Sequence, residues 1–290
     1  MMDQEIKEIT DDYLSGRLDR RSFFRRMTAV LGSYTLVHHY LEVSGLAAGP
    51  IARREAELAS VETREVHYPS GEHSILASLS LHSGGESAPA VVVIHENRGL
   101  NEHTRDVARR FAVAGYVAIA PDFLSRAGGT AAAGSPDGAR QVIRRISWQD
   151  VTADMIAART YLQGLPEVSG HKVGSVGFCW GGARSFRFAT SDPELSAAVV
   201  FYGSPPPEDL LDGIRCPILG LYGENDTRVT STVEATRAQM EARGKSYEPV
   251  IYPGAEHAFF NDTRADRHDP EASADAWQRV LRFFEVHLTP

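Results

Sequence analysis

A run of glycines around a single cysteine constrains the fold of this chain more than any other feature. The run is Gly177-Phe178-Cys179-Trp180-Gly181-Gly182, and it lies between a β-prone segment at 172–176 and a segment with helical character at 183–190. A chain that turns directly from a strand into a helix leaves little room for side chains, so glycines beside the turn avoid collisions with neighbouring backbone. The pattern predicts a strand-turn-helix unit that holds Cys179 outward, the arrangement called a nucleophile elbow.

The predicted position of Cys179 has a chemical consequence. Backbone dipoles in a helix sum to a partial positive charge at its N-terminus, which favours a thiolate over a thiol. A thiolate at this turn could attack a carbonyl carbon near neutral pH. The alternative is that Cys179 is a small buried apolar residue, and that the glycines serve only the close packing of the strand against the helix.

Length and composition are those of an ordinary globular protein. The 290 residues include 42% hydrophobic and 23% charged side chains, and the formal net charge is −8. No long basic stripe interrupts that negative balance, so we expect no nucleic-acid partner. The only cysteines, Cys179 and Cys216, form no disulfide framework and lack the paired spacing of a zinc site. Cys216 precedes Pro217 at the start of an apolar strand, where we expect inert packing.

Residues 1–58 differ from the rest and are interpreted as a helical extension, which precedes a main domain over residues 59–290. Within the extension, Asp19-Arg20-Arg21-Ser22-Phe23-Phe24-Arg25 resembles a twin-arginine export motif, and the Ala47-Ala48 region resembles a cleavage site. Two histidines and a glutamate interrupt the apolar part, which makes it a poor export signal and too polar for a membrane span. The alternative is an amphipathic helical pair that docks on the main domain or on a second subunit, giving a homodimer.

From Val61 onward, apolar β-rich runs alternate with helical patterns, which indicates a mostly parallel sheet with helices on both faces. The predicted strands, of which the first two form an antiparallel pair, are residues 66–68, 75–81, 91–94, 116–120, 173–178, 197–202, 218–222 and 248–252. Helical periodicity marks residues 103–114, 147–162, 232–243 and 272–287. Eight strands suit an α/β-hydrolase fold. The Gly- and Ala-rich stretch 128–138 is too short for a cap domain, and we expect it to form a mobile loop over the site.

A cysteine nucleophile needs a base that takes its proton and an acid that orients the base, and in this fold they follow in the order nucleophile, acid, histidine. Asp226 ends an apolar strand that runs into a polar loop, and His257 follows the last strand. Both lie at carboxyl ends of strands, where ligands gather in open α/β sheets. Glu224 is a rival acid, Asp226 also suits a turn, and His257 could be an ordinary surface histidine. Ser175 lacks the spacing of an elbow serine and is expected in mid-strand.

The segment His95-Glu96-Asn97-Arg98-Gly99-Leu100 follows the strand at 91–94, in the loop that supplies one backbone N–H of an oxyanion hole in this fold. The N–H of Trp180 would supply the other. Together they would stabilise the negative charge that develops on a carbonyl oxygen as Cys179 adds to it. Adjacent histidine and glutamate residues also suggest a metal site, but this segment lacks the i, i+4 histidine pair of a zinc protease helix, so we expect no metal.

In combination these motifs resemble the dienelactone hydrolase family, over roughly Val61 to the C-terminus. The matching segments are 95–99, 121–123, 177–182 and 252–259. The resemblance implies that Cys179 is the nucleophile, that His257 is the general base and that Asp226 orients it. It also implies that Glu96 contacts the thiol and helps to deprotonate it when substrate binds.

The resemblance further implies that Asn97 provides the oxyanion N–H that pairs with that of Trp180. In family members that act on dienelactone, arginines bind the substrate carboxylate, and Arg126 stands where one of them is expected. Asn261 occupies the position of the second, four residues past the histidine. A clamp of two arginines would therefore need Arg98 or Arg264. The extension also resembles the leader found on a subset of these hydrolases.

We therefore expect an α/β-hydrolase that cleaves a small carboxylic ester or lactone through a thioester on Cys179, without a cofactor. The alternative is a non-hydrolytic protein of the same fold, in which Cys179 is a redox-sensing thiol. The sequence favours a cytoplasmic location, while the leader-like motif leaves periplasmic export open.

Overall fold

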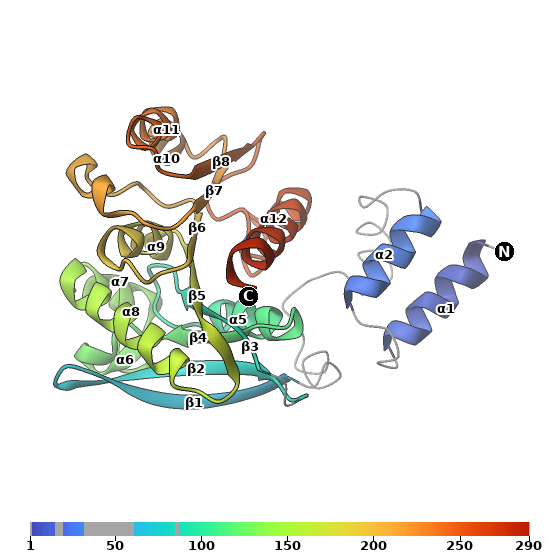
Figure 1. Cartoon of the computed structure of the whole chain (residues 1–290), viewed down its shortest axis with the longest axis horizontal. Helices are drawn as coiled ribbons and strands as arrows, with labels where there is room; N and C mark the ends of the chain where they lie inside the picture. The colour runs from blue at the N-terminus through green and yellow to red at the C-terminus, as the bar shows by residue number, and fades with distance from the viewer. Residues whose placement is uncertain (1, 15–19, 32–60, 85–86, 290) are drawn as a thin grey trace.

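The computed structural model describes residues 2–14, 20–31, 61–84 and 87–289 (Figure 1). Two N-terminal helices, α1 (Met2–Leu14) and α2 (Arg20–Leu31), come before an eight-stranded sheet with helices on both faces. The predicted boundary near residue 58 and the cleavage-like Ala47-Ala48 region lie outside the described residues. The two arginines of the export-like motif begin α2.

Helices α1 and α2 pack against each other. Ile6 and Ile9 of α1 and Phe23 and Met27 of α2 are buried, and their spacings of three and four residues place each pair on one face of its helix. The described residues of the expected extension thus form a helix pair, and docking of the extension on a second subunit stays a prediction. None of the described helices combines the length and the apolar character needed to span a membrane.

The sheet begins with an antiparallel hairpin and continues as a parallel sheet. Its strands are β1 (Val61–Ser70), β2 (His73–His82), β3 (Ala88–Ile94), β4 (Val117–Pro121), β5 (Val168–Phe178), β6 (Ala197–Phe201), β7 (Ile218–Gly223) and β8 (Tyr247–Tyr252). Their order is β1-β2-β4-β3-β5-β6-β7-β8, with β2 antiparallel to β1 and β4 and every later pair parallel. The eight strands and the α/β-hydrolase fold predicted from the sequence are confirmed.

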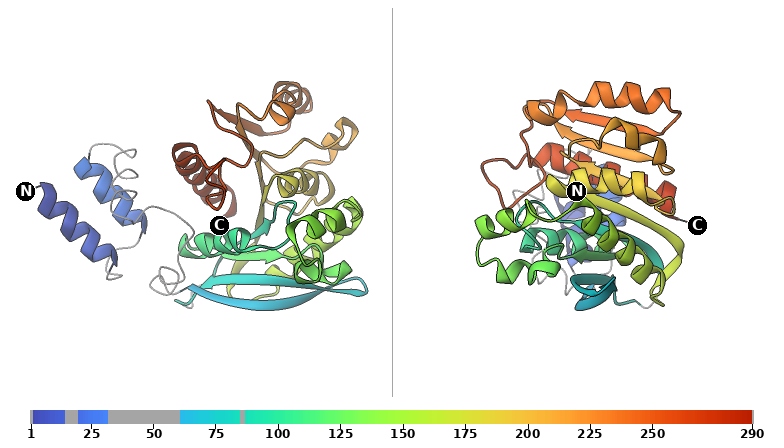
Figure 2. Two further views of the ribbon diagram at one scale, coloured as in Figure 1. Left: turned by 180° about the vertical axis from the view of Figure 1, so that it is seen from behind. Right: turned by 90° about the vertical axis from the view of Figure 1, so that its left-hand side faces the viewer.

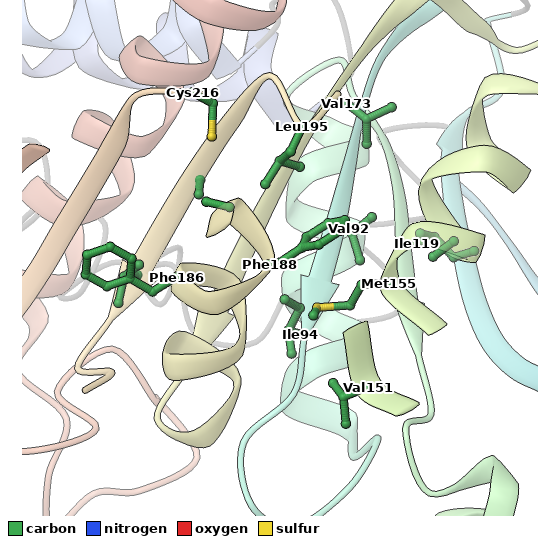
Figure 3. Close-up of a cluster of buried hydrophobic side chains, with 14 of the residues drawn as sticks. Val92, Ile94, Ile119, Val151, Met155, Val173, Phe186, Phe188, Leu195 and Cys216 are labelled. Atoms are coloured by element: carbon green, nitrogen blue, oxygen red, sulfur yellow. The ribbon is translucent and has the colours of Figure 1, made fainter. Parts of the chain in front are cut away.

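Alternate residues of the central strands enter two separate cores, as the period of two in a strand requires. Val92 and Ile94 of β3 join the core beneath α8 (Trp148–Gln163) and α9 (Trp180–Ser191) (Figure 3). Val91 and Val93 join the core beneath α5 (Glu102–Val113) and α12 (Pro270–Leu288). Figure 2 shows these two helical layers on opposite sides of the sheet. Because both faces are covered, β3, β4 and β6 consist of apolar residues throughout.

The predicted long helices are also present, but the expected loop at 128–138 is wrong. The remaining helical elements are η1 (Ser125–Ala127), α6 (Gly129–Ala132), α7 (Pro136–Ile143), η2 (Glu208–Gly213), α10 (Thr227–Thr230) and α11 (Val233–Ala242). The side chain of Ser135 accepts a hydrogen bond from the N–H of Gly138, and Pro136 occupies the first turn of α7. Serine at the cap and proline in the first turn are strong helix-start signals, which outweigh the glycines of this stretch.

Candidate active site

The turn between β5 and α9 is the strand-turn-helix unit predicted from the sequence. Cys179 occupies it with φ 57° and ψ −113°, a conformation that L-residues rarely adopt. A Cβ atom on Gly177 would lie 2.0 Å from the carbonyl oxygen of Gly181. A Cβ atom on Gly181 would lie 2.4 Å from the carbonyl oxygen of His95. Both glycines are therefore required by backbone packed around the bend.

Cys179 lies in a cavity of about 440 Å³ and is partly exposed there. His257, from the loop after β8, lines the same cavity, and its ring interacts with the cysteine strongly enough for Cys179 to be one cause of the raised pKa of the ring. Nδ1 of that histidine lies 2.5 Å from Oδ2 of Asp226, which follows β7 and is buried. The structure thus brings together the cysteine, the histidine and the aspartate that the sequence singles out.

The environment of His257 raises the pKa of its ring to about 9. Burial acts in the opposite direction, because it disfavours the charged imidazolium, but the hydrogen bonds to Asp226 and Cys179 outweigh it. A protonated ring beside the sulfur is the partner that a thiolate needs. The arrangement can therefore hold an ion pair of thiolate and imidazolium.

Glu224, the rival acid, is used elsewhere. Its Oε2 accepts a hydrogen bond of 2.8 Å from the N–H of Gly254, and its neighbour Asn225 donates to the carbonyl of that same glycine. These contacts join the loops that follow β7 and β8. Asp226 is consequently the carboxylate of this loop that reaches the histidine.

Glu96 is buried behind the cavity. Oε2 of its carboxylate accepts a hydrogen bond of 3.0 Å from Nδ2 of Asn261, and the hydroxyl of Tyr202 lies 3.5 Å from Oε1. Tyr202 has φ 39° and lines the cavity, and its ring packs edge-on against His257 at 5.0 Å between centroids. The negative charges of Glu96 and Cys179 add to burial in raising the pKa of Tyr202 well above its ordinary value. Tyr202 is therefore a neutral hydroxyl between the carboxylate and the triad.

Asn97 and Trp180, the predicted oxyanion donors, both line the cavity. Neither backbone N–H donates to an acceptor within the described part of the chain. Trp180 is the first residue of α9, where helix geometry leaves the N–H groups free. These two free N–H groups can donate hydrogen bonds to an oxygen that becomes negatively charged.

Arg126 and Arg98, predicted to bind substrate, are not among the residues that line this cavity. Arg126 binds the fully buried carboxylate of Asp154, with its Nη2 2.7 Å from Oδ1, and also donates to the hydroxyl of Ser70. Its guanidinium is thus committed to the protein interior. Arg264, the other arginine considered, is paired with Asp266.

The sequence reasoning missed the arginines that do line the cavity. They are Arg140 and Arg144, in and after α7, and Arg228 of α10. Arg140 is paired with Asp137, and Arg228 lies 4.0 Å from Asp226, whereas Arg144 has no carboxylate partner among the described residues. The helix-start signal at 135–136 could have revealed α7. No local signal shows that α7 packs over the cysteine.

The remaining lining residues are Ile143, Ala183 and Ser204. The lining therefore carries three arginines and no carboxylate, although the whole chain has a formal net charge of −8. Within the described ranges, no group of three or more His, Cys, Asp or Glu side chains is placed to hold a metal ion. The cavity is accordingly a small positively charged pocket around a cysteine, a histidine and two free amides.

A model of the dienelactone hydrolase family matches residues 77–288. The chain belongs to the dienelactone hydrolase family. A Salmonella typhimurium protein with the provisional name carboxymethylenebutenolidase is 36% identical over 210 residues, which cover 68% of this chain and 76% of that protein. The crystal structure of a provisionally named dienelactone hydrolase from Klebsiella pneumoniae is 32% identical, with a TM-score of 0.71 over 77% of this chain and 98% of that one.

Another similar structure is that of a protein named for a different hydrolytic activity. It is a dienelactone hydrolase-like promiscuous phosphotriesterase from metagenomic libraries, 25% identical, with a TM-score of 0.66 over 79% of this chain and 100% of that one. The family match begins within β2 and ends within α12. It therefore spans the loops that bear the cysteine, the aspartate and the histidine, and excludes α1 and α2.

Proposed function

We propose that this protein hydrolyses small carboxylic esters or lactones through a thioester on Cys179. The observation that carries the proposal is that Cys179, on its strained turn, lines one cavity with His257. Asp226 orients this histidine, with its Oδ2 2.5 Å from Nδ1. Membership of the dienelactone hydrolase family supports the same reaction class. The roles of the individual residues are part of the proposal.

In the first half-reaction the thiolate sulfur of Cys179 adds to the substrate carbonyl carbon, and the carbonyl oxygen becomes an oxyanion. The N–H groups of Asn97 and Trp180 stabilise that charge. The tetrahedral adduct then expels the alkoxide, which takes a proton from the His257 imidazolium and leaves as an alcohol. In a lactone the alcohol stays attached to the far end of the acyl chain.

In the second half-reaction His257, now neutral, takes a proton from a water molecule whose oxygen adds to the thioester carbonyl. Collapse of this second adduct breaks the carbon–sulfur bond, releases the carboxylic acid and restores the thiolate of Cys179. Asp226 stabilises the imidazolium in both halves by accepting the hydrogen bond from Nδ1. Each proton that leaves the histidine is regained within one turnover.

Glu96 is proposed to assist when substrate enters. Nδ2 of Asn261 donates a hydrogen bond of 3.0 Å to the carboxylate of Glu96. Asn261 stands at the position where the resemblance to the family implies a second arginine. An amide orients a carboxylate without supplying a counter-charge, unlike the arginine that the resemblance implied at this position. Where Cys179 still carries its proton, we assign Glu96 the role of taking that proton as substrate binds and passing it to His257, which leaves the thiolate and imidazolium that the first half-reaction uses.

The substrate class is proposed from the charge of the lining. Three arginines without a lining carboxylate favour a substrate that bears a carboxylate or another anionic group. Arg144 is the arginine whose charge no described carboxylate neutralises. We assign Arg144 the substrate-binding role that the sequence analysis expected of Arg126.

The test is hydrolysis of p-nitrophenyl acetate and of a carboxylate-bearing ester and lactone by the full chain. Wild-type protein is expected to hydrolyse them, and Cys179→Ala to lose the activity. Mass spectrometry of wild-type protein quenched during the reaction with p-nitrophenyl acetate should show one acetyl group on Cys179. The Cys216→Ala control should carry the same acetyl group. Equal rates for wild type and Cys179→Ala would overturn the proposal and favour the redox alternative.

A further inference from the structure

His95 is fully buried and contacts both segments that supply the proposed oxyanion donors. Its ring stacks on the indole of Trp180 with 5.3 Å between centroids and 13° between planes, and it meets Phe123 edge-on at 5.4 Å. Its carbonyl oxygen is one of two backbone oxygens, with that of Ile94, that lie against Gly181 of the elbow. Sequence reasoning considered this residue only as a metal ligand.

The two ring nitrogens of His95 have different and complementary partners. Nε2 accepts a hydrogen bond of 3.3 Å from the backbone N–H of Phe123. Nε2 therefore carries no proton, and the ring is the Nδ1–H tautomer. Nδ1 lies 2.6 Å from the carbonyl oxygen of Glu96, so it donates to that oxygen. Burial lowers the pKa of His95, against the hydrogen bond to Glu96 and the charge of Asp122, which supports a neutral ring.

The hydrogen bond to Glu96 fixes a peptide plane and not only an oxygen atom. No described peptide bond is cis, and in a trans peptide the C=O and the following N–H point in opposite directions. The C=O of Glu96 is directed at the imidazole of His95. The N–H of the same peptide belongs to Asn97, and it is thereby directed away from that ring.

Resting on the proposed function, we infer that His95 is a positioning residue that sets the Asn97 N–H for the oxyanion. A flipped peptide would turn the carbonyl of Glu96 toward the site and remove the donor. The loop is held from its other end as well, because the hydroxyl of Thr130 accepts from the N–H of Leu100 and donates to the carboxylate of Asp122. The imidazole of His95 is what fixes the peptide between these supports.

The test compares His95→Asn with His95→Leu, two side chains of nearly equal size. Asparagine places an N–H where Nδ1 stands, whereas leucine has no donor, and both lose the stacking on Trp180. We expect His95→Leu to lower kcat about 10- to 100-fold, since loss of one oxyanion donor costs about 100- to 1,000-fold. His95→Asn is expected to recover most of that loss, with KM nearly unchanged in both.

Two further measurements separate positioning from structural damage. Alkylation of Cys179 by iodoacetamide needs the thiolate but no oxyanion hole, so its rate in His95→Leu should equal that of wild type. In ¹⁵N-histidine NMR spectra, the signal that His95→Asn removes should be that of a neutral ring protonated at Nδ1. This spectrum tests the inference even if the wild type proves inactive.

The inference is overturned if Asn and Leu variants lose kcat equally, if the leucine variant keeps wild-type kcat, or if the ring is protonated at Nε2. Failure of the proposed function would look different. In that case wild type itself would show no hydrolysis that depends on Cys179, whatever the His95 variants do.

Discussion

Nδ1 of His257 and Oδ2 of Asp226 lie 2.5 Å apart, although the residues come from loops after two different strands. The strands, β7 and β8, are parallel neighbours, so their carboxyl ends meet at one edge of the sheet. The buried carboxylate faces a ring that also contacts Cys179. This pairing determines the charge of the ring, and so the pH range in which the cysteine can react.

Hydrolysis is expected to fall as pH rises through about 9, the pKa of His257. Below that pH the ring is protonated, which stabilises the thiolate and supplies the proton for the leaving alcohol. Above it both functions are lost. The measurement is kcat/KM of wild-type protein between pH 5 and pH 10, corrected for spontaneous hydrolysis.

Asp226→Asn is the matched variant for this profile. An amide cannot stabilise the imidazolium, so the alkaline limb should move toward the ordinary histidine value of 6.5. The same shift affects folding. Because the folded state holds the proton more tightly, its contribution to stability is full below about pH 6.5 and disappears by about pH 9. An alkaline limb unchanged in Asp226→Asn would contradict the assignment.

The strands and long helices could be predicted because the pattern of apolar and polar residues within each segment indicates its structure. Residues 91–94 form an apolar run that is buried on both faces, and Gly177 is required by backbone contacts within its own turn. The stretch 128–138 was misjudged because its glycines and alanines outweighed the signal of Ser135 and Pro136 at the start of α7.

The positions of Cys179, Asp226 and His257 in the fold were predictable because they follow strand ends, whereas the arginines that line the cavity were not. Arg126 follows a strand as expected, but its partner Asp154 lies 28 residues further on and is fully buried. Nothing in the local sequence reveals that pairing. Arg144 and Arg228 are exposed residues in unremarkable segments, and only the packing of α7 and α10 around the cysteine brings them to the cavity.

Substitution of Arg126 is expected to reduce stability and not substrate affinity. Arg126→Gln leaves the fully buried carboxylate of Asp154 without its cation, which should cost about 3 kcal/mol of unfolding free energy. Urea denaturation measures that loss, and KM for a carboxylate-bearing ester should stay near the wild-type value. A raised KM with unchanged stability would instead show that Arg126 binds the substrate.

Arg144→Gln should show the reverse pattern. Arg144 is exposed and lacks a carboxylate partner among the described residues, so unfolding free energy should be unaffected. Its loss is expected to raise KM for an anionic ester about tenfold, which corresponds to about 1.4 kcal/mol. A neutral ester of the same size serves as the control, and a parallel rise in its KM would argue against charge recognition.

Two glycine-to-alanine substitutions test the packing of the elbow. In Gly181→Ala the new methyl group would lie 2.4 Å and 2.5 Å from the backbone oxygens of His95 and Ile94. Overpacking of that severity should cost at least about 3 kcal/mol or distort the turn until hydrolysis is lost. Gly164→Ala is the control, since its methyl group would meet no atom closer than 3.5 Å. Comparable stability of the two variants would mean that the elbow is looser than described.

The two cysteines should differ sharply in reactivity toward a disulfide reagent at pH 8. Cys179 is partly exposed in the cavity that His257 also lines, whereas burial raises the pKa of Cys216 to about 12. We expect one thiol per chain to react rapidly in the folded protein and the second only after denaturation. Cys179→Ala should abolish the rapid phase, while Cys216→Ala should leave its rate unchanged. Because modification blocks the nucleophile, hydrolysis of p-nitrophenyl acetate should fall in step with the rapid phase. Activity that survives full modification of Cys179 would show that this sulfur is not the attacking atom.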